Sequence, residues 1–409
     1  MSVEQRKLSN TFKEFFESEK SSGMLLIICT GVSLLLANSI LGSKYLSIWQ
    51  IYVGGLSVEH WINDALMAVF FLLIGLELER ELYNGELSNF KNALLPIFAA
   101  VGGLCLPALI HFVLNAGTPT QPGIGIPMAT DIAFALGVLA LLGRHVPASL
   151  KVFLAALAVM DDLGAIIVIA VFYTAQLSVA YLLGAIAVFG LLVVLNYCFR
   201  VMSLMPYLLG GALMWLLLLN SGVHATITGV LLAFAMPFSA KEDDEESPSH
   251  QLEHVLHKPV AFLILPIFAL ANTGIVIGPD WPQNLTNANS VGIIGGLVFG
   301  KPLGITLLSF VAVTLGICKL PLDLHWWHVF GAGLLGGIGF TMSIFITNLA
   351  FVENPEAINA AKMAILLASL IAGAIGFLWL KLLGKPKESD KDIDTMDFHA
   401  TEMRAHEDA

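Results

Sequence analysis

Apolar runs of about 20 residues recur along most of the 409-residue chain, and they constrain its fold more than any other feature. An α-helix needs a run of about this length to cross the hydrocarbon core of a bilayer. The composition agrees, because 57% of the residues are hydrophobic, only 12% are charged, and the mean hydropathy is +0.81. The chain is therefore predicted to be an all-α polytopic membrane protein. Disordered, nucleic-acid-binding and secreted disulfide-rich classes are excluded.

Hydropathy predicts about twelve transmembrane helices. They are placed at 23–41, 62–83, 93–114, 123–142, 150–173, 179–199, 205–220, 223–238, 259–279, 290–315, 327–351 and 357–384. Of the 20 Lys and Arg residues, only Lys44 and Lys362 then fall on the outer side, as the positive-inside rule requires when both termini are cytoplasmic. We expect three regions: a cytoplasmic amphipathic segment at 1–22, a twelve-helix membrane domain at 23–384, and an acidic, disordered cytoplasmic tail at 385–409.

Two of the predicted spans, the fourth and the eleventh, carry signs of interruption. In span four, Pro127 removes a backbone hydrogen bond, and the nearby Asp131 can satisfy freed donors or neutralise a helix N-terminus. Span eleven contains five glycines, which either let neighbouring helices approach closely or let the span unwind: Gly331, Gly333, Gly336, Gly337 and Gly339. Spans 3–5 and 10–12 enter the membrane from opposite sides, which predicts an inverted-topology repeat with a transport site where the interrupted spans meet.

Four ionisable residues lie deep in predicted spans: Asp131, Asp161, Asp162 and Lys301. A charge at the bilayer centre costs roughly 3 kcal/mol or more, so such residues are presumed functional. Asp161 and Asp162 are adjacent, so their side chains point about 100° apart on a helix and one of them needs a separate partner. Carboxylate oxygens suit small hard cations, and a buried pair of acids is suited to exchanging protons for such an ion. Lys301 is the obvious counter-charge. The alternatives are a helix cap and a purely structural ion pair.

A second group of titratable residues gathers at the predicted inner ends of spans two and nine. Its members are Glu77, Glu81, Glu253, His254 and His257. Histidine titrates near neutral pH, so this group is a candidate for pH control from the cytoplasmic side, and His224 is a weaker candidate. Capping or packing is the alternative role for a single histidine at a helix end. Residues 43–60 are compatible with an outer hairpin.

Several strings of these residues give the chain a family resemblance over about residues 10–384. They are FFLLIGLELERE (70–81), ATDIAFALGVLALLG (129–143), DDLGAII (161–167), SGVHAT (221–226), LEHVLH (252–257), GKPLGI (300–305) and GIGFTMSIFI (337–346). With these strings the chain resembles the bacterial NhaA sodium/proton antiporters. That family has an inverted-repeat architecture, which the resemblance therefore implies for this chain.

The resemblance also implies a role for each matching residue. Asp161 and Asp162 would form the cation and proton site and ligate the transported Na⁺, with Asp131 and Thr130 at the crossing of the interrupted helices and Lys301 as the counter-charge. The helix breaks would lie at Pro127, Gly336, Gly337 and Gly339. The cytoplasmic pH-responsive region would comprise Glu77, Arg80, Glu81, Glu253, His254 and His257. Glu79 and Gln251 depart from the family pattern, since basic residues are expected there, and they make this region more acidic.

The expected function is therefore a secondary antiporter that exports Na⁺ or Li⁺ in exchange for periplasmic H⁺ and serves sodium and pH homeostasis. We expect it to be electrogenic and pH-activated, to lie in the bacterial inner membrane, and to form a homodimer through the 43–60 hairpin. It is not expected to be an enzyme, to need a cofactor or to bind nucleic acid. The alternatives are a proton-coupled carrier of another small solute, which needs a larger polar cavity with Arg or aromatic ligands, and a channel or structural membrane component.

Overall fold

The computed structural model describes residues 21–88, 90–174, 177–239, 247–279, 281–352 and 354–384. Nearly all of the predicted segment at 1–22 and the whole tail at 385–409 lie outside these residues. The chain divides into two compact units. Unit 1 comprises residues 1–28, 90–165 and 277–409, and unit 2 comprises residues 29–89 and 166–276.

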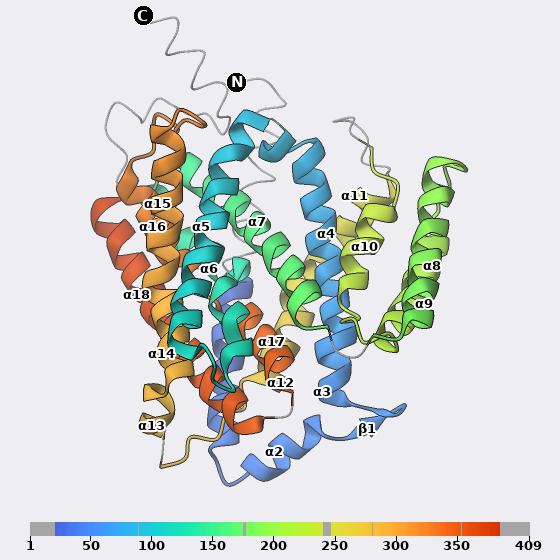
Figure 1. Ribbon diagram of the computed structural model, residues 1–409, viewed down its shortest axis with the longest axis horizontal. Coiled ribbons are helices and arrows are strands. Elements are labelled where there is room, and N and C mark those ends of the chain that lie inside the picture. Colours follow the sequence, from blue (N-terminus) through green and yellow to red (C-terminus); the bar gives the residue numbers. More distant parts are fainter. Residues whose placement is uncertain are drawn as a thin grey trace, which may run out of the picture. The chain divides into compact units, whose positions relative to one another are not determined.

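Unit 1 is helical wherever regular structure is described. Its elements are α5 (Phe90–Asn115), η3 (Gln121–Met128), α6 (Ile132–Leu142), η4 (Gly143–His145), most of α7 (Ala148–Phe172), α13 (Trp281–Thr286), α14 (Ala288–Gly295), η6 (Gly296–Gly300), α15 (Lys301–Thr314), α16 (Trp326–Gly336), α17 (Phe340–Ala350) and α18 (Pro355–Leu383). Helix α5 packs along α15, and α16 packs against both α15 and α18 (Figure 1). Gly102 and Gly304 face each other in the α5–α15 contact, and a Cβ on either would overlap the other's carbonyl. The missing side chains therefore let these two helices pack closely.

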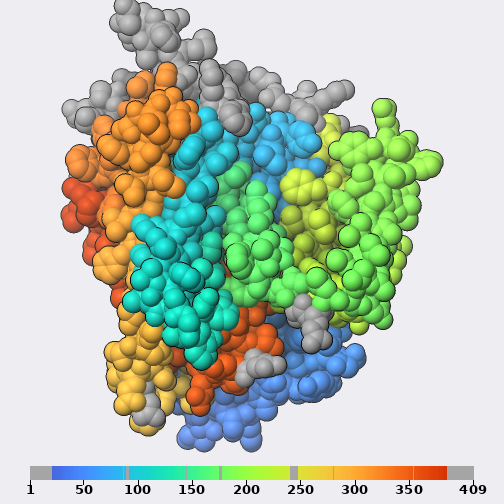
Figure 2. All heavy atoms as spheres, in the orientation of Figure 1, coloured from blue at the N-terminus to red at the C-terminus, as the bar shows by residue number. Residues whose placement is uncertain are grey.

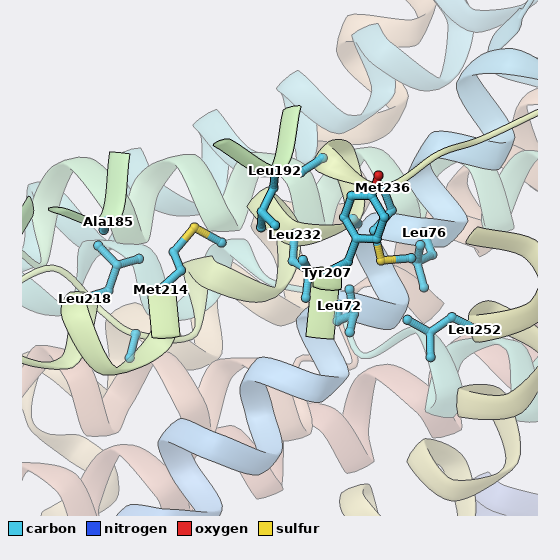
Figure 3. Close-up of a cluster of buried hydrophobic side chains, with 13 residues drawn as sticks. Leu72, Leu76, Ala185, Leu192, Tyr207, Met214, Leu218, Leu232, Met236 and Leu252 are labelled. Carbon is cyan, nitrogen blue, oxygen red and sulfur yellow. The ribbon is translucent and has the colours of Figure 1, made fainter. Parts of the chain in front are cut away.

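Unit 2 combines helices with one short hairpin. Besides residues 29–37 of the helix Ser21–Ala37, its elements are α2 (Gly42–Trp49), β1 (Tyr52–Val53), β2 (Leu56–Ser57), α3 (Val58–Trp61), η1 (Ile62–Leu66), α4 (Met67–Tyr83), η2 (Glu86–Ser88), α8 (Val179–Tyr197), α9 (Leu204–Leu219), α10 (Ile227–Ala235), α11 (Pro248–Pro259), η5 (Val260–Ile264) and α12 (Leu265–Asn272). Helix α10 packs on α4, and α8 pairs with α9. Leu72, Tyr207, Met214 and Leu232 belong to a buried apolar cluster that fills the space among these helices (Figure 3).

The hairpin lies inside the segment 43–60, where the sequence suggests one. Tyr52 pairs with Ser57 and Val53 pairs with Leu56 in an antiparallel register. Gly54 and Gly55 form the turn with φ angles of 62° and 92°. Two consecutive positive φ angles are readily available only to glycine, so the Gly-Gly pair selects this tight turn.

The all-α polytopic class is confirmed. Among the described residues, eight helices are long and apolar enough to cross a membrane, and ten if each bent helix pair is one span. Helices α8 and α9, green in Figure 2, expose large apolar side chains such as Leu183, Ile186 and Leu209, as a lipid-facing surface requires. Helix α10 has nine residues and is thus about 14 Å long, so it does not cross a core of about 30 Å by itself. The number twelve stays a prediction.

The predicted boundaries are wrong for span nine. The helix runs over Pro248–Asn272, whereas hydropathy places it at 259–279. Its start is set by capping, because the Ser247 hydroxyl accepts a hydrogen bond from the backbone N–H of His250 and Pro248 occupies the first helical position. A hydropathy window does not register such polar starting signals.

Candidate functional site

Span four is interrupted in the structure. The 3₁₀ helix η3 contains Pro127 and ends at Met128, and the backbone is extended at Ala129 and Asp131 before α6 begins. Asp131 is the N-cap residue of α6, since its Oδ1 accepts a hydrogen bond of 3.0 Å from the backbone N–H of Phe134. The Asp131 carboxylate therefore satisfies a backbone donor at the start of α6.

Span eleven is interrupted as well. Helix α16 ends at Gly336, α17 begins at Phe340, and the two are bent by 48°. A Cβ on Gly339 would lie 3.1 Å from the carbonyl oxygen of Ala129. Before the break, a Cβ on Gly333 would lie 2.7 Å from the Cα atom of Pro302 in α15. The glycines of this span therefore do both things that the sequence allows: some pack against neighbours, and others form the break.

The two breaks meet at Asp131, which is 2% exposed. Its backbone N–H donates to the carbonyl of Ile338 at 2.7 Å. Its Oδ2 accepts hydrogen bonds from the backbone N–H of Thr341 at 3.0 Å and from the Thr341 hydroxyl at 2.5 Å. One carboxylate thus contacts the N-termini of both α6 and α17, where the helix dipoles favour negative charge. That the two interrupted segments cross at the midplane of a bilayer stays a prediction.

Lys301 connects α7 to the same place. Its Nζ lies 2.5 Å from Oδ2 of Asp161, and the two side chains are 0% and 1% exposed. The ammonium also donates to the hydroxyl of Thr130 at 3.0 Å, and this hydroxyl donates to the carbonyl of Gly336 at 2.7 Å. The Asp161–Lys301 pair is therefore hydrogen-bonded to both helix breaks through Thr130.

Asp162 follows Asp161 on α7 and is 1% exposed. We call Thr130, Asp131, Asp161, Asp162 and Lys301 the membrane polar group. All five residues belong to unit 1 and are at most 3% exposed. Its carboxylate and hydroxyl oxygens are the hard ligands that small cations prefer, and Lys301 supplies a charge that can compensate one carboxylate when no cation is bound.

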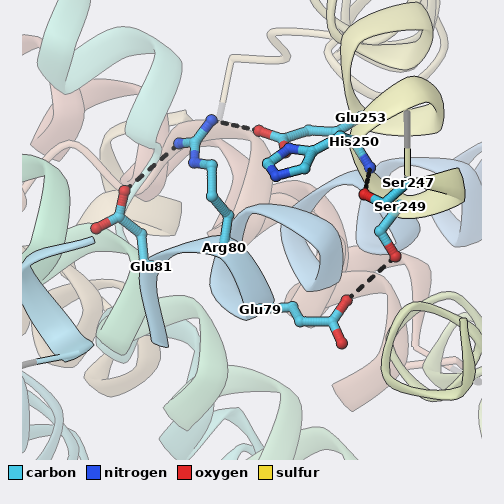
Figure 4. A network of polar contacts seen from close by, with 7 residues as sticks. All are labelled: Glu79, Arg80, Glu81, Ser247, Ser249, His250 and Glu253. Atoms are coloured by element: carbon cyan, nitrogen blue, oxygen red, sulfur yellow. Dashed lines mark hydrogen bonds and ion pairs between the residues drawn. The ribbon is translucent and has the colours of Figure 1, made fainter. Parts of the chain in front are cut away.

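The residues expected to respond to cytoplasmic pH form a second polar group, in unit 2. Arg80 in α4 donates through Nη1 to Oε1 of Glu253 in α11, and its Nη2 lies 3.4 Å from Oε1 of Glu81 (Figure 4). His250 Nδ1 lies 3.9 Å from Oε2 of Glu253. The unexpected acid Glu79 is 5% exposed and accepts a 3.4 Å hydrogen bond from the Ser249 hydroxyl. These contacts fasten the end of α4 to the start of α11.

The other members of the predicted set are less closely placed. Glu77 and His257 are half-buried, and His254 and Gln251 are exposed.

His224 lies apart from these residues. It precedes α10, and its Nε2 is 2.7 Å from the carbonyl oxygen of Tyr173. Gly229 packs beside Ala68 and Leu72, whereas Gly75 packs beside Val230 and Ala233, so α10 and α4 run in the same direction. His224 is therefore near the beginning of α4, whereas Arg80 is near the other end of α4.

Sequence reasoning missed several members of these groups. Thr341 binds the Asp131 carboxylate, and the Ser343 hydroxyl donates to the carbonyl of Ile126 at 2.7 Å. They lie two and four residues after Gly339, the last glycine of span eleven, and that position is the signal that could have identified them. Ser249 and His250 belong to a polar stretch outside the predicted span nine, so no pattern connected them to Glu79 and Glu253.

Comparisons with known proteins show the family of this chain. The model of the family Na⁺/H⁺ antiporter 1 matches residues 13–380. The chain is 75% identical over 380 residues to the Na⁺/H⁺ antiporter NhaA of Dechloromonas aromatica (strain RCB), covering 93% of this chain and 98% of the relative. It is 59% identical over 385 residues to the Na⁺/H⁺ antiporter NhaA of Cytophaga hutchinsonii, covering 94% and 98%. This chain belongs to the Na⁺/H⁺ antiporter 1 family, and like that family it is a multi-pass membrane transporter and not an enzyme.

Proposed function

We propose that the chain exports Na⁺ in exchange for H⁺ through the membrane polar group. Family membership supports the exchange of these two ions, and the apolar helices support a site within a bilayer. The distribution of Lys and Arg supports a topology with both termini in the cytoplasm, and hence a bacterial inner membrane as the location. Sodium and pH homeostasis follow as the physiological role.

One observation carries this proposal: three carboxylates and one ammonium, each at most 2% exposed, are gathered in unit 1 at two helix breaks. Each of these charges is expensive inside a membrane, so a purely structural role would be better filled by apolar residues. In this proposal Asp131 stays bound to the N-termini of α6 and α17 and is not itself exchanged. Asp161, Asp162 and Lys301 remain for the exchange.

We assign these three residues different tasks. Asp162 is a direct ligand of Na⁺, and Asp161 pairs with Lys301 when the cation is absent. Because the groups are close together, they titrate as a coupled set and share their protons. In this scheme one Na⁺ replaces two protons, so each cycle moves one net charge. A membrane potential then contributes about 2.3 kcal/mol per 100 mV to the cycle.

Three further properties belong to the proposal. Li⁺ is a second substrate, because it is a small hard cation like Na⁺. Exchange is activated as the cytoplasmic pH rises, and we place this response at the acids and histidines of the second polar group, which joins α4 to α11. Two copies associate through the segment 43–60, in which the hairpin exposes Tyr52 and Val53.

Proteoliposomes that contain a pH-sensitive dye test the exchange. We expect Na⁺ and Li⁺ to dissipate a pH gradient, and K⁺ or sugars to leave it unchanged. Asp162→Asn removes the response. Asp64→Asn is the matched control, because Asp64 belongs to unit 2 and forms an ion pair of 2.7 Å with His60. A response to sugars, or full exchange in the Asp162→Asn protein, would overturn the proposal.

A further inference from the structure

A buried histidine joins two helices of unit 1 away from the membrane polar group. His111 in α5 is 0% exposed, and Asn289 in α14 is 3% exposed. The His111 Nε2 and the Asn289 Oδ1 are 3.0 Å apart, so the imidazole N–H donates to the amide oxygen. Neither residue takes part in the proposed exchange of Na⁺ and H⁺.

Asn115 extends this contact to the beginning of the interrupted span four. Its Nδ2 donates to the carbonyl of His111 at 3.0 Å and to the carbonyl of Ala288 at 3.1 Å. Its Oδ1 accepts from the Thr120 hydroxyl at 2.7 Å, directly before η3 begins. Within η3, a Cβ on Gly123 would lie 3.2 Å from Oδ1 of Asn289. The pair therefore lies where α5, α14 and the start of η3 meet.

The helix that carries Asn289 also carries Lys301. Helix α14, the π-turn η6 and α15 follow one another without a gap, and residues 288–314 form one candidate span. The contacts with α5 are ordered, since Gly292 lies beside His111, Gly300 beside Pro107, and Gly304 beside Gly102. The two segments are thus antiparallel neighbours (Figure 1). Lys301 lies twelve residues after Asn289, about 18 Å along the helix axis.

The contact between His111 and Asn289 is compatible only with a neutral His111. Among the described residues, the His111 Nδ1 and the Asn289 Nδ2 are buried and have no hydrogen-bond partner. With Nε2–H bonded to Asn289, a second proton on Nδ1 would be a buried charge without an acceptor, which is costly. Helices α5 and α14 contain no Asp or Glu, and neither do η3, η6, α13 and α15, which pack against them. Helix α18, which packs on α14, contributes the buried Lys362 and Glu356, in its first turn.

We infer that His111 and Asn289 are positioning residues for Lys301, and that they hold α14 against α5 only while His111 is neutral. Protonation of His111 from the outer side loosens this contact, shifts the helix that ends at Lys301, and weakens exchange. This inference rests on the proposed exchange. If it holds, exchange depends on the outer pH through His111, which contacts neither Na⁺ nor the exchanged protons.

The test uses oriented proteoliposomes in which the inner pH is fixed and the outer pH is lowered from 8 to 5.5, across the ordinary range of histidine near pH 6.5. At an outer pH of 5.5, the rate of Na⁺/H⁺ exchange by the wild type should be about five-fold lower than that of the His111→Gln protein. At pH 8 the two rates should be equal. Asn289→Asp gives the imidazolium a carboxylate partner, so it should also abolish the acid loss. His60→Gln is the control, because His60 is half-exposed in unit 2 and should leave the wild-type profile unchanged.

Identical outer-pH profiles of wild type and the His111→Gln protein would overturn the inference, and so would an acid loss that persists in the Asn289→Asp protein. Absence of exchange in the wild type would instead refute the proposed function. Thermal unfolding of the purified proteins supplies a second readout if a variant is inactive. The wild-type Tm should fall between pH 8 and pH 5.5 by more than the Tm of either variant, and equal falls would also count against the inference.

Discussion

The two units each hold an ion pair, and the pairs differ in their access to water. In unit 1, the Lys301 and Asp161 side chains are 0% and 1% exposed. In unit 2, the Arg80 side chain is 40% exposed, and its partner Glu253 is 9% exposed. Because the first pair is buried away from water, it is costly to break and sensitive to an incoming cation. In the second pair, water can replace one charged group as the partner of the other. On the basis of this difference we propose that unit 1 carries out ion exchange and that unit 2 adjusts its pH range.

The largest expected effect comes from removing one partner of the buried pair. Lys301→Ala leaves Asp161 buried without its counter-charge, which should lower the free energy of unfolding by about 3–5 kcal/mol. Thermal or denaturant unfolding of purified protein measures this. Adding Asp161→Asn should restore part of the loss, because the uncompensated charge is then gone. We also expect Lys301→Ala to leave some Na⁺ binding but to change the pH or voltage dependence of exchange.

A loss below about 1 kcal/mol in the Lys301→Ala protein would contradict this view, because it is the size expected for an exposed pair. The same result would remove the distinction between the two units.

Two hydroxyl groups provide a second comparison between the units. The expected effect of removing them is intermediate in size. The Thr341 hydroxyl donates to Asp131 at 2.5 Å in unit 1, and the Ser249 hydroxyl donates to Glu79 at 3.4 Å in unit 2. Thr341→Val should cost about 1–3 kcal/mol of stability and slow exchange, because a buried carboxylate loses a donor. Ser249→Ala should cost less, since its hydrogen bond is long. Thr341→Ser keeps the hydroxyl and is the control. Equal costs for the Thr341→Val and Ser249→Ala proteins would argue against the comparison.

The smallest effect on stability is expected at the Arg80–Glu253 pair. Glu253→Gln should cost about 0–1 kcal/mol, because Arg80 remains partly solvated. It should move the pH profile of exchange while leaving the maximal rate largely unchanged, and His254→Ala should act in the same direction. Exchange rates in proteoliposomes at several pH values measure both quantities. If these variants abolish exchange at every pH at normal protein levels, the Arg80–Glu253 group belongs to the transport site.

Several features of unit 1 could be predicted from the sequence because each has a local cause. Pro127 before Asp131 predicts the first break, and the glycines around Gly337 predict the second. Burial of Lys301 follows from its place in an apolar run.

Other features depend on contacts between distant segments. The bond of Thr341 to Asp131 requires both breaks to meet, and the His111–Asn289 contact requires α5 and α14 to lie side by side. The start of α11 is set by the Ser247 cap, which hydropathy does not register. For this reason the sequence predicts the class and the charged residues better than their hydrogen-bond partners.

The central claim is that Na⁺ displaces protons from the membrane polar group through Asp162. Its most direct test is proton release from purified protein in weakly buffered detergent solution when Na⁺ is added. The wild type and the Asp64→Asn control should both release protons in a saturable way, and the Asp162→Asn protein should release none even at saturating Na⁺. Saturable, Na⁺-dependent proton release from the Asp162→Asn protein would contradict the account.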